Sequence, residues 1–394
     1  MAISGDLGDL TRGFPFVLPT RVEYGLGAAG RAGAEAATLG TRALVVTDPG
    51  VRDAGLVEPV VAALHAAGLD AEVFAEIEPN PRAETVDRGA AACVDAGADV
   101  LVALGGGSAI DSAKAISAVA KHGGTALDYE GLELVPGPTI PLIAIPTTAG
   151  TGSEVTMWSI VTDPATHHKA PLGSVHFAPR VALVDPLVTL SLPPALTATT
   201  AIDALTHAIE GYTARCSNPV SDALALYAVE LITGTIDRAV ADGGDLEARS
   251  ALMLGSLLAG IAFGNSDTAA VHSLAEAIGG ARDVPHGLAN AIFLPFVVRH
   301  NQPAVPGKTA RLGRAMGLDT ARMPVDEAGA ATVAALFHLI DRLGVPSLRR
   351  AGGTAGDEPL VVRLAMMNLG TPDNPVEMTD ESFSALFLEA LSRD

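Results

Sequence analysis

Short apolar runs alternate with alanine-rich amphipathic stretches over roughly the first half of the chain. Near-continuous apolar runs separated by helical stretches, such as residues 57–67 and 83–96, are typical of a parallel sheet covered by helices on both faces. This half is therefore predicted to form a Rossmann-like α/β domain. The candidate strands are residues 43–48, 70–77, 99–107, 141–148 and 180–186.

The pattern changes near residue 192, where a Pro193-Pro194 pair precedes a long region of helical periodicity. Runs of β-branched residues become rare beyond this point, so the second half is predicted to be all-helical. The predicted domains are a nucleotide-binding α/β domain over 1–192 and a helical metal-binding domain over 193–394. The predicted helices are 196–214, 219–241, 246–263, 267–279, 286–301, 327–343 and 379–391.

Length and composition agree with two globular domains. The chain has 394 residues, of which 48% are hydrophobic and 18% charged, and this length exceeds what one ordinary core supports. The formal net charge of -20 repels phosphate backbones and anionic lipids, so neither a nucleic acid nor a membrane surface is expected as a partner. The two cysteines, Cys93 and Cys216, exclude a disulfide scaffold and a cysteine-based zinc site.

The opening segment, MAISGDLGDLTRGF, has neither a basic n-region nor an apolar h-region, so a signal peptide is not expected. Every long apolar run is interrupted by glycine, proline or charge, and a transmembrane span is not expected either. These features predict a cytoplasmic protein.

Two glycine-rich segments compete as the phosphate-binding loop. GLGAAG, residues 25–30, fits G-x-G-x-x-G, but a lone match among 42 glycines is a weak signal, and a simple turn into a helix is the favoured interpretation. In LVALGGGSAIDSAKAI a strand leads directly into residues 105–108 and then a helix. Glycines allow close approach of a pyrophosphate, and free N–H groups at a helix start favour an anion. The second segment is therefore the predicted phosphate site.

Two further features belong to a nucleotide groove. Asp48 ends the apolar run ALVVTD, where a carboxylate can accept from ribose hydroxyls and repel a 2′-phosphate, which favours NAD over NADP. A solvated acidic turn residue is the alternative. Residues 146–156, PTTAGTGSEVT, follow another strand and could line the groove, or form an ordinary Ser/Thr-rich loop.

The candidate metal ligands lie in the second half. Asp203 and His207 are four residues apart on a predicted helix, and this spacing places both side chains on one face. His272 lies on a later helix, and His286 follows Pro285 at the start of the next. One carboxylate and three imidazoles suit Fe²⁺ or Zn²⁺, which could hold a substrate oxygen and act as a Lewis acid.

Several segments resemble motifs of the iron-containing (group III) alcohol dehydrogenases, within the dehydroquinate-synthase-like superfamily. The matching segments occur in the family's order across nearly the whole chain. The resemblance implies an N-terminal Rossmann-like domain, a C-terminal helical domain, an active-site cleft between them and a homodimer. The segments are GGGSAIDSAK, PTTAGTGSEVT, DALTHAIE, NPVSDALAL and VPHGLANAIFLP.

The resemblance also assigns residues. It implies Asp203, His207, His272 and His286 as iron or zinc ligands, and it does not use GLGAAG as the pyrophosphate site. Val188 is the weakest of the implied cofactor-groove positions, which are Asp48, Asn80, Gly106, Gly107, Ser108, Thr147, Thr148, Lys169 and Val188.

The sequence departs from the family's pattern near the metal ligands. Members usually carry another histidine four residues after the third ligand, often linked to proton transfer, and here this position is Glu276. Glu276 could relay a proton, bind the metal or be simply polar; with His272 it is a predicted catalytic residue. Trp158 could narrow the pocket or pack in the core. Arg282 raises the alternative of an anionic substrate, beside that of an ordinary surface arginine.

The predicted function is hydride transfer between NAD(H) and a small primary alcohol or aldehyde, with the metal polarising the substrate oxygen. The alternatives are a dehydroquinate-synthase-like lyase that uses NAD transiently, a hydroxyacid-oxoacid transhydrogenase on the same scaffold, and a non-catalytic binding protein. The same fold hosts several chemistries, so the fold alone does not decide among them.

Overall fold

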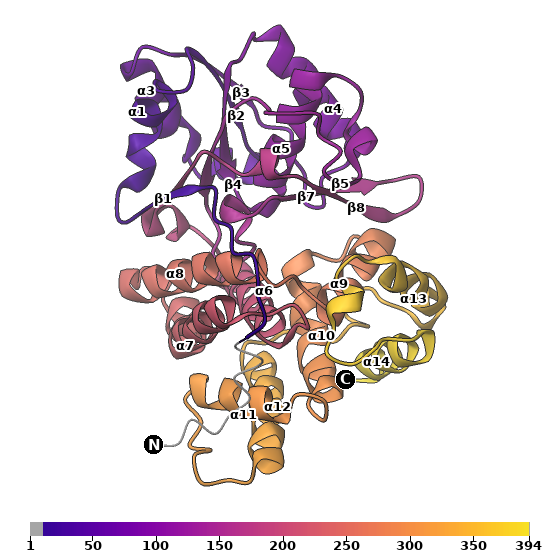
Figure 1. Ribbon diagram of the computed structural model, residues 1–394. Helices are drawn as coiled ribbons and strands as arrows, with labels where there is room; N and C mark the ends of the chain where they lie inside the picture. The colour runs from indigo at the N-terminus through magenta and orange to yellow at the C-terminus, as the bar shows by residue number, and fades with distance from the viewer. Residues whose placement is uncertain (1–10, 394) are drawn as a thin grey trace. The chain divides into compact units, whose positions relative to one another are not determined.

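The structure, a computed structural model, describes residues 11–393 and contains two compact units (Figure 1). Residues 18–193 form the α/β unit, and residues 194–393 form the helical unit. Residues 11–17 lie with the helical unit, although the sequence pattern assigned them to the first domain. The backbone of Val17 makes this contact, because its N–H donates to the Asn265 side chain (2.6 Å) and its carbonyl accepts from the same amide (3.1 Å).

The α/β unit is built on a six-stranded sheet in which all neighbouring strands are parallel. This confirms the predicted parallel sheet. The short edge strand β1 was not predicted, because its sequence, RVEY, is half polar and it lies at the sheet edge. The strand order is β1 (Arg21–Tyr24), β9 (Val181–Val184), β6 (Leu142–Pro146), β4 (Val100–Gly105), β2 (Arg42–Val46) and β3 (Asp70–Phe74).

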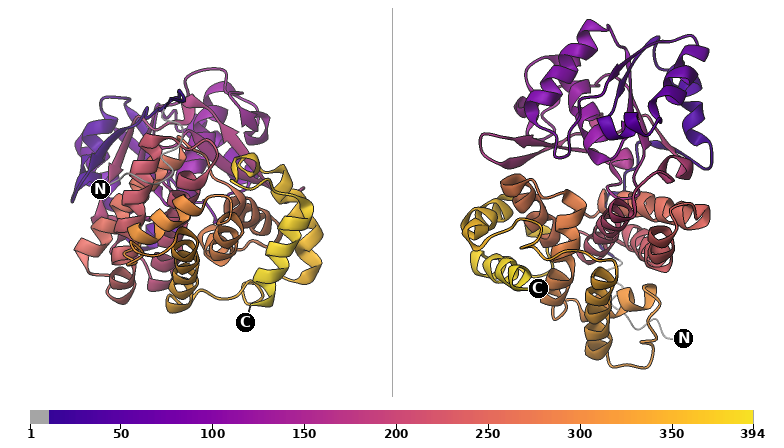
Figure 2. Two further views of the ribbon diagram at one scale, coloured as in Figure 1. Left: turned by 60° about the horizontal axis from the view of Figure 1, so that its bottom comes forward. Right: turned by 180° about the vertical axis from the view of Figure 1, so that it is seen from behind.

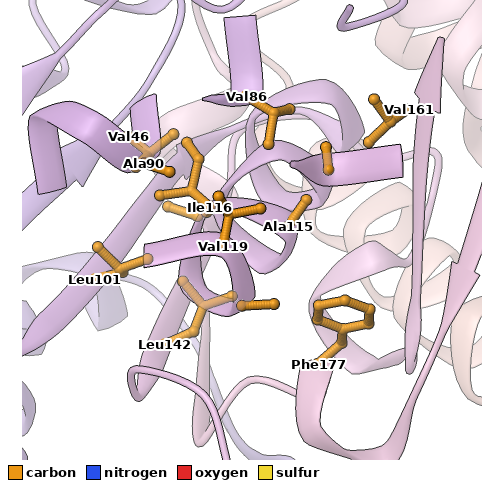
Figure 3. Packing of buried hydrophobic residues seen from close by; sticks show 14 of the residues in the cluster. Val46, Val86, Ala90, Leu101, Ala115, Ile116, Val119, Leu142, Val161 and Phe177 are labelled. Atoms are coloured by element: carbon orange, nitrogen blue, oxygen red, sulfur yellow. The ribbon is translucent and has the colours of Figure 1, made fainter. Parts of the chain in front are cut away.

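Helices cover both faces of this sheet, as the continuous apolar runs predicted. Alternate strand residues point to opposite faces: Leu101 belongs to one buried cluster and Val102 to the other. Figure 3 shows the first cluster, where Ile116 and Val119 of a helix pack among strand residues such as Leu101. The helices are α4 (Ala83–Asp95) and α5 (Gly107–His122) on this face, and α1 (Ala32–Ala36) and α3 (Val57–Ala66) on the other; the short α2 (Pro49–Asp53) follows β2.

The strand order creates one point where the direction of winding reverses. From β2 the chain goes outward to β3, and it then returns past β2 to β4 before continuing to β6 and β9. The carboxyl ends of β2 and β4 therefore lie side by side and their connections leave in opposite directions. In open α/β sheets, ligands bind in the crevice at such a point.

A second, smaller sheet was not predicted. It contains β5 (Gly131–Leu132), β8 (His168–Gly173) and β7 (Trp158–Asp163), and β7 pairs with β8 in antiparallel fashion. The strand β8, HKAPLG, contains a proline and a lysine and so lacks an apolar run. Trp158 packs on the backbone of Gly173, where an added Cβ would lie 2.6 Å from the indole. This contact gives the tryptophan a packing role.

The second unit is helical, as predicted. The helices α6, α7 and α8 lie side by side in both views of Figure 2. The ten-residue helices α11 and α13 were not predicted, because they are short. The helices are α6 (Pro194–Thr213), α7 (Pro219–Ala241), α8 (Leu246–Phe263), α9 (Ala270–Arg282), α10 (His286–Asn301), α11 (Pro306–Ala315), α12 (Val325–Arg342), α13 (Glu358–Met367) and α14 (Asp380–Ser392).

Two helices, α7 and α8, are long and apolar enough to cross a membrane by length and composition. Helices in the core of a soluble protein satisfy the same criterion. Both pack against α6 within the helical unit, and 61% of the apolar window of α8 is buried there. Packing inside the unit therefore accounts for the apolar character of α8.

Candidate metal centre and cofactor groove

Helix α6 supplies two of the predicted metal ligands from one buried face. Asp203, His207 and Glu210 are spaced four and three residues apart, so their side chains share a side of the helix. All three are nearly inaccessible to solvent. Carboxylates and imidazoles are seldom buried without a partner or a metal. We therefore expect these three side chains to bind a metal or to pair with other polar groups.

The other two predicted ligands lie at the starts of two later helices of the chain, α9 and α10. His272 lies in the first turn of α9, and His286 is the first residue of α10, directly after Pro285. Asp283, in left-handed conformation (φ 54°), ends α9 and reverses the chain between the two histidines. Both helices contact one another and α10 contacts α6, so three helices converge on one point.

The four predicted ligands are brought together. One atom each from Asp203, His207, His272 and His286 lies within 4.8 Å of all the others. The Nε2 atoms of His207 and His272 are 3.0 Å apart, and Asp203 Oδ1 is 3.5 Å from His286 Nε2. A tetrahedral ion with bonds of about 2.1 Å separates its ligand atoms by about 3.4 Å. The donor set and its spacing therefore fit a divalent metal.

Glu210 is a residue of this centre that the sequence analysis missed. Its carboxylate accepts from His272 Nδ1 (2.6 Å) and from the backbone N–H groups of Val271 (2.7 Å), Ala269 (3.1 Å) and His272 (3.4 Å). Burial raises the pKa of Glu210 to about 7, against the lowering effect of these N–H donors. The available signal was its position, three residues after His207 on the same helical face.

This contact assigns the tautomer of His272. When the carboxylate accepts from Nδ1–H, the proton is on Nδ1 and the lone pair is on Nε2. The Nε2 atom is the one that faces His207. Carboxylates that orient a metal-binding histidine in this way fix the ring and raise its basicity. Glu210 therefore orients the imidazole of His272, a predicted ligand.

Asn290 is a second residue that the sequence analysis missed, although it lies four residues after His286 on α10. Its side chain is fully buried, and its Nδ2 lies 2.6 Å from Asp203 Oδ1. The same atom lies 3.2 Å from Nε2 of His272 and 3.2 Å from Nε2 of His286. Asn290 thus contacts a predicted ligand on each of the three helices.

Glu276 lies one turn beyond His272 on α9 and is half-buried. Its carboxylate accepts a hydrogen bond from Asn368 Nδ2 at 2.6 Å. Arg282, at the end of the same helix, donates from Nε to Asp357 at 2.7 Å. The charge of Arg282 is therefore already balanced by a carboxylate within the helical unit.

In the α/β unit, the predicted phosphate loop begins α5 at the winding reversal. The loop needs glycine because a Cβ on Gly107 would lie 2.6 Å from the side chain of Thr151. Asp48 follows β2 and caps α2 by accepting from the Val51 N–H (3.0 Å). Its carboxylate also approaches the end of β4, since a Cβ on Gly105 would lie 3.3 Å from Oδ2.

The remaining predicted groove residues follow other strands. Thr147 donates its N–H to the carbonyl of Gly105 (3.0 Å), and the side chain of Thr148 lies against Gly106. These contacts place both threonines beside the phosphate loop, which runs from Gly106 through Gly107 to Ser108 at the start of α5.

Asn80 and Lys169 form a buried pair, with 2.8 Å between the lysine Nζ and the amide oxygen. Asn80 adopts a left-handed conformation (φ 52°). Val188, in the 3-10 helix Pro186–Thr189 after β9, is partly buried and packs against the hydrophobic core.

The competing GLGAAG segment lies next to β1 at the sheet edge, away from the winding reversal. Its helix-start N–H groups already have an acceptor, because Gly27 and Ala29 both donate to the carboxylate of Asp185 at 3.1 Å. The turn therefore binds an anion supplied by the chain itself. This agrees with its interpretation as a turn into a helix.

The comparisons with known proteins identify the class. Residues 19–186 match the family "Iron-containing alcohol dehydrogenase", and residues 197–391 match "Fe-containing alcohol dehydrogenase family, C-terminal". The chain is 39% identical over 376 residues to a choline dehydrogenase of Bacillus subtilis, with 94% of each chain covered.

Solved structures agree with this assignment. A 1,3-propanediol oxidoreductase superimposes with a TM-score of 0.93 at 37% identity, covering 96% of this chain and all of that one. A sulfoacetaldehyde reductase from Bifidobacterium kashiwanohense, solved with NAD⁺, gives a TM-score of 0.85 at 32% identity and covers 97% of this chain and all of that one.

The chain thus combines a Rossmann-like parallel sheet with a helical unit that carries a possible metal site. The chain belongs to the iron-containing alcohol dehydrogenase family. It is an oxidoreductase of small alcohols and aldehydes, as the predicted function stated.

Proposed function

We propose that this enzyme is an NAD-dependent, metal-containing dehydrogenase that interconverts small primary alcohols and their aldehydes. The observation that carries the proposal is the convergence of Asp203, His207, His272 and His286 within 4.8 Å in a chain of this family. Fe²⁺ is the proposed metal, with Zn²⁺ as the alternative, because both accept imidazole and carboxylate ligands.

The proposed reaction is a two-electron oxidation. The alcohol carbon loses a hydride to the nicotinamide ring of NAD⁺ and the hydroxyl loses a proton, which yields an aldehyde, NADH and H⁺. A bound divalent metal would polarise the substrate oxygen as a Lewis acid. Four side chains of the helical unit would hold the ion, and the proton would leave through water, the ribose hydroxyls or Glu276, one turn from His272.

In the α/β unit, the N–H groups at the start of α5 are proposed to bind the pyrophosphate of NAD. Gly106 and Gly107 leave space for it, and the helix start favours its negative charge. Asp48, beside the end of β4, is proposed to accept from the ribose hydroxyls, which favours NAD over NADP. A homodimer and a cytoplasmic location stay predictions.

The proposed substrate is neutral, and an anionic substrate stays the alternative. The residue that suggested an anion, Arg282, pairs with Asp357 within the helical unit. A short chain of two or three carbons agrees with relatives named for choline and 1,3-propanediol.

The test is a metal-reconstitution assay. Protein stripped with a chelator is loaded anaerobically with Fe²⁺ or Zn²⁺, and NADH absorbance is followed with a panel of short alcohols and aldehydes. We expect NADH to form or disappear only in the loaded protein, and His272→Ala to abolish both metal retention and turnover. Full activity in the stripped protein would contradict the proposal. Bound metal and NAD without net NADH turnover would favour the lyase or the transhydrogenase.

A further inference from the structure

Two charged residues of the segment GGGSAIDSAK, Asp111 and Lys114, are not used by the proposed function. Both lie on α5, four and seven residues after Gly107, and residues at this spacing share one face of a helix. Lys114 is fully buried and Asp111 is partly buried. Because charged side chains are seldom buried without specific partners, the contacts of this face indicate its role.

Lys114 binds the segment that follows β6. Its Nζ donates to the Ser153 hydroxyl (2.9 Å), the Thr156 hydroxyl (3.2 Å) and the Trp158 carbonyl (2.6 Å). These three acceptors match the three N–H donors of an ammonium group. Lys114 therefore ties residues 153–158 to α5 at three points.

Asp111 binds the same segment from one turn earlier on the helix. One carboxylate oxygen accepts from the Ser153 hydroxyl, and the other accepts from the Ile160 N–H (3.1 Å). The first oxygen also lies 3.8 Å from Lys114 Nζ, so the two opposite charges are paired. Because the Ser153 hydroxyl accepts from Lys114 and donates to Asp111, the three side chains form one connected network.

The same face of α5 begins at the predicted phosphate loop. A Cβ on Gly107 would lie 2.6 Å from the side chain of Thr151, so this side chain packs directly on the first turn of the helix. The Thr151 hydroxyl accepts from the Ser153 N–H (3.3 Å). A shift of Ser153 would therefore also move Thr151 relative to the start of α5.

We propose that Asp111 and Lys114 are positioning residues for the pyrophosphate of NAD, because they hold the segment after β6 so that Thr151 packs on Gly107 and shapes the phosphate loop. Buried ion pairs often add little to stability, and their best-attested use is to fix one arrangement of a structure. This inference rests on the proposed function and deepens it, since it gives a role in cofactor binding to two residues that need not touch the cofactor.

The test measures the binding of ADP-ribose, which contains a pyrophosphate, and of adenosine, which lacks one, by calorimetric titration of the metal-loaded, full-length protein. Lys114→Met keeps the length of the side chain and removes its three donors. We expect it to weaken ADP-ribose binding at least about tenfold, because hydrogen bonds to a charged group are worth at least this factor. Adenosine binding should change by less than about twofold.

A milder variant covers the case in which Lys114→Met does not fold. Ser153→Ala removes the one hydroxyl that links Lys114 to Asp111. It should weaken ADP-ribose binding about threefold, the effect of one ordinary hydrogen bond, and leave adenosine binding unchanged. The matched control is Lys121→Met, which removes an exposed lysine from the same helix and should leave both affinities as in the wild type.

A double-mutant cycle tests whether the effect passes through Thr151. In a Thr151→Gly background, Lys114→Met should weaken ADP-ribose binding by at most about twofold, because the side chain that it positions is already missing. A purely structural role of Lys114 would weaken the binding of both ligands alike. Its effect would also stay the same in the Thr151→Gly background.

The outcomes separate this inference from the proposed function. The inference is overturned by equal weakening of both ligands, by an undiminished effect in the Thr151→Gly background, or by wild-type ADP-ribose affinity in the Lys114 and Ser153 variants. In each of these cases, NADH formation by the metal-loaded wild type still supports the proposed function. If the wild-type protein binds neither ADP-ribose nor NAD⁺, the proposed function fails and this inference fails with it.

Discussion

The substitution Glu210→Gln tests how the helical unit prepares a ligand for the metal. In the structure one carboxylate oxygen accepts from the Val271 N–H, and the other faces His272 Nδ1 and the N–H groups of Ala269 and His272. An amide can satisfy only one of these sides, because its NH₂ group is a donor. In either orientation the new NH₂ group therefore faces an N–H donor that the carboxylate oxygen had accepted from.

Both orientations of the new amide weaken the centre. If the NH₂ faces His272, the imidazole must accept on Nδ1 and carry its proton on Nε2, the atom needed for the metal. If the NH₂ faces Val271, a buried N–H loses its acceptor. Removal of such an orienting carboxylate typically lowers metal affinity 10- to 100-fold. This corresponds to about 1.4–2.8 kcal/mol of metal-binding free energy.

The assay is competition for Zn²⁺ between the protein and a chromophoric chelator, combined with thermal unfolding of the metal-free protein. The control is Asp357→Asn, which alters another carboxylate that caps a helix start in the same unit. We expect this control to shift thermal unfolding and leave the metal affinity unchanged. Wild-type Zn²⁺ affinity in Glu210→Gln would refute the reasoning about the tautomer.

Three further predictions concern the ligands, the phosphate loop and the pH dependence of stability. His207→Ala should lower bound metal from one ion per chain to nearly none in elemental analysis, with a fall of at least about 100-fold in kcat/KM; retained metal would contradict the ligand set. Gly107→Ala should weaken NAD binding at least about tenfold in fluorescence titration, because its Cβ would meet a side chain at 2.6 Å. Gly30→Ala, whose Cβ meets nothing within 4 Å, should bind NAD normally, and equal effects would refute the loop assignment. Burial raises the pKa of Asp267 to about 6 from 3.8. Between these two pH values the folded state holds a proton that the unfolded state has released, so the free energy of unfolding falls as the pH rises through 6. Asp267→Asn should therefore raise the free energy of unfolding by ~2 kcal/mol at pH 7.5 and by less at pH 5; denaturant titrations with equal gains at both pH values would contradict this.

Much of the fold was predictable from local pattern. The central strands and the long helices have strong apolar periodicity, and their buried faces are continuous in the sequence. The strands that escaped prediction depend on tertiary pairing, whereas the missed helices α11 and α13 are short. The strand β8 contains a proline and a lysine, and it forms because β7 supplies its hydrogen-bonding partner.

The candidate site was partly predictable for the same reason. Asp203 and His207 are visible as an i,i+4 pair, and histidines are conspicuous as metal ligands. Glu210 and Asn290 are ordinary residues for a helix, and their roles arise only when α9 and α10 pack against α6. The pairing of Arg282 with Asp357 joins residues 75 positions apart, which no local pattern reveals.

The most direct test of the account is a titration of the stripped enzyme with Fe²⁺ or Zn²⁺ while the initial rate of NADH formation from a short primary alcohol is measured. The account predicts that the rate rises in proportion to bound metal and reaches its plateau at one ion per chain. The same titration of His272→Ala should show neither tight binding nor a rise in rate. A rate that is independent of metal, or a full rate in His272→Ala, would contradict the claim that these four side chains form the catalytic metal centre.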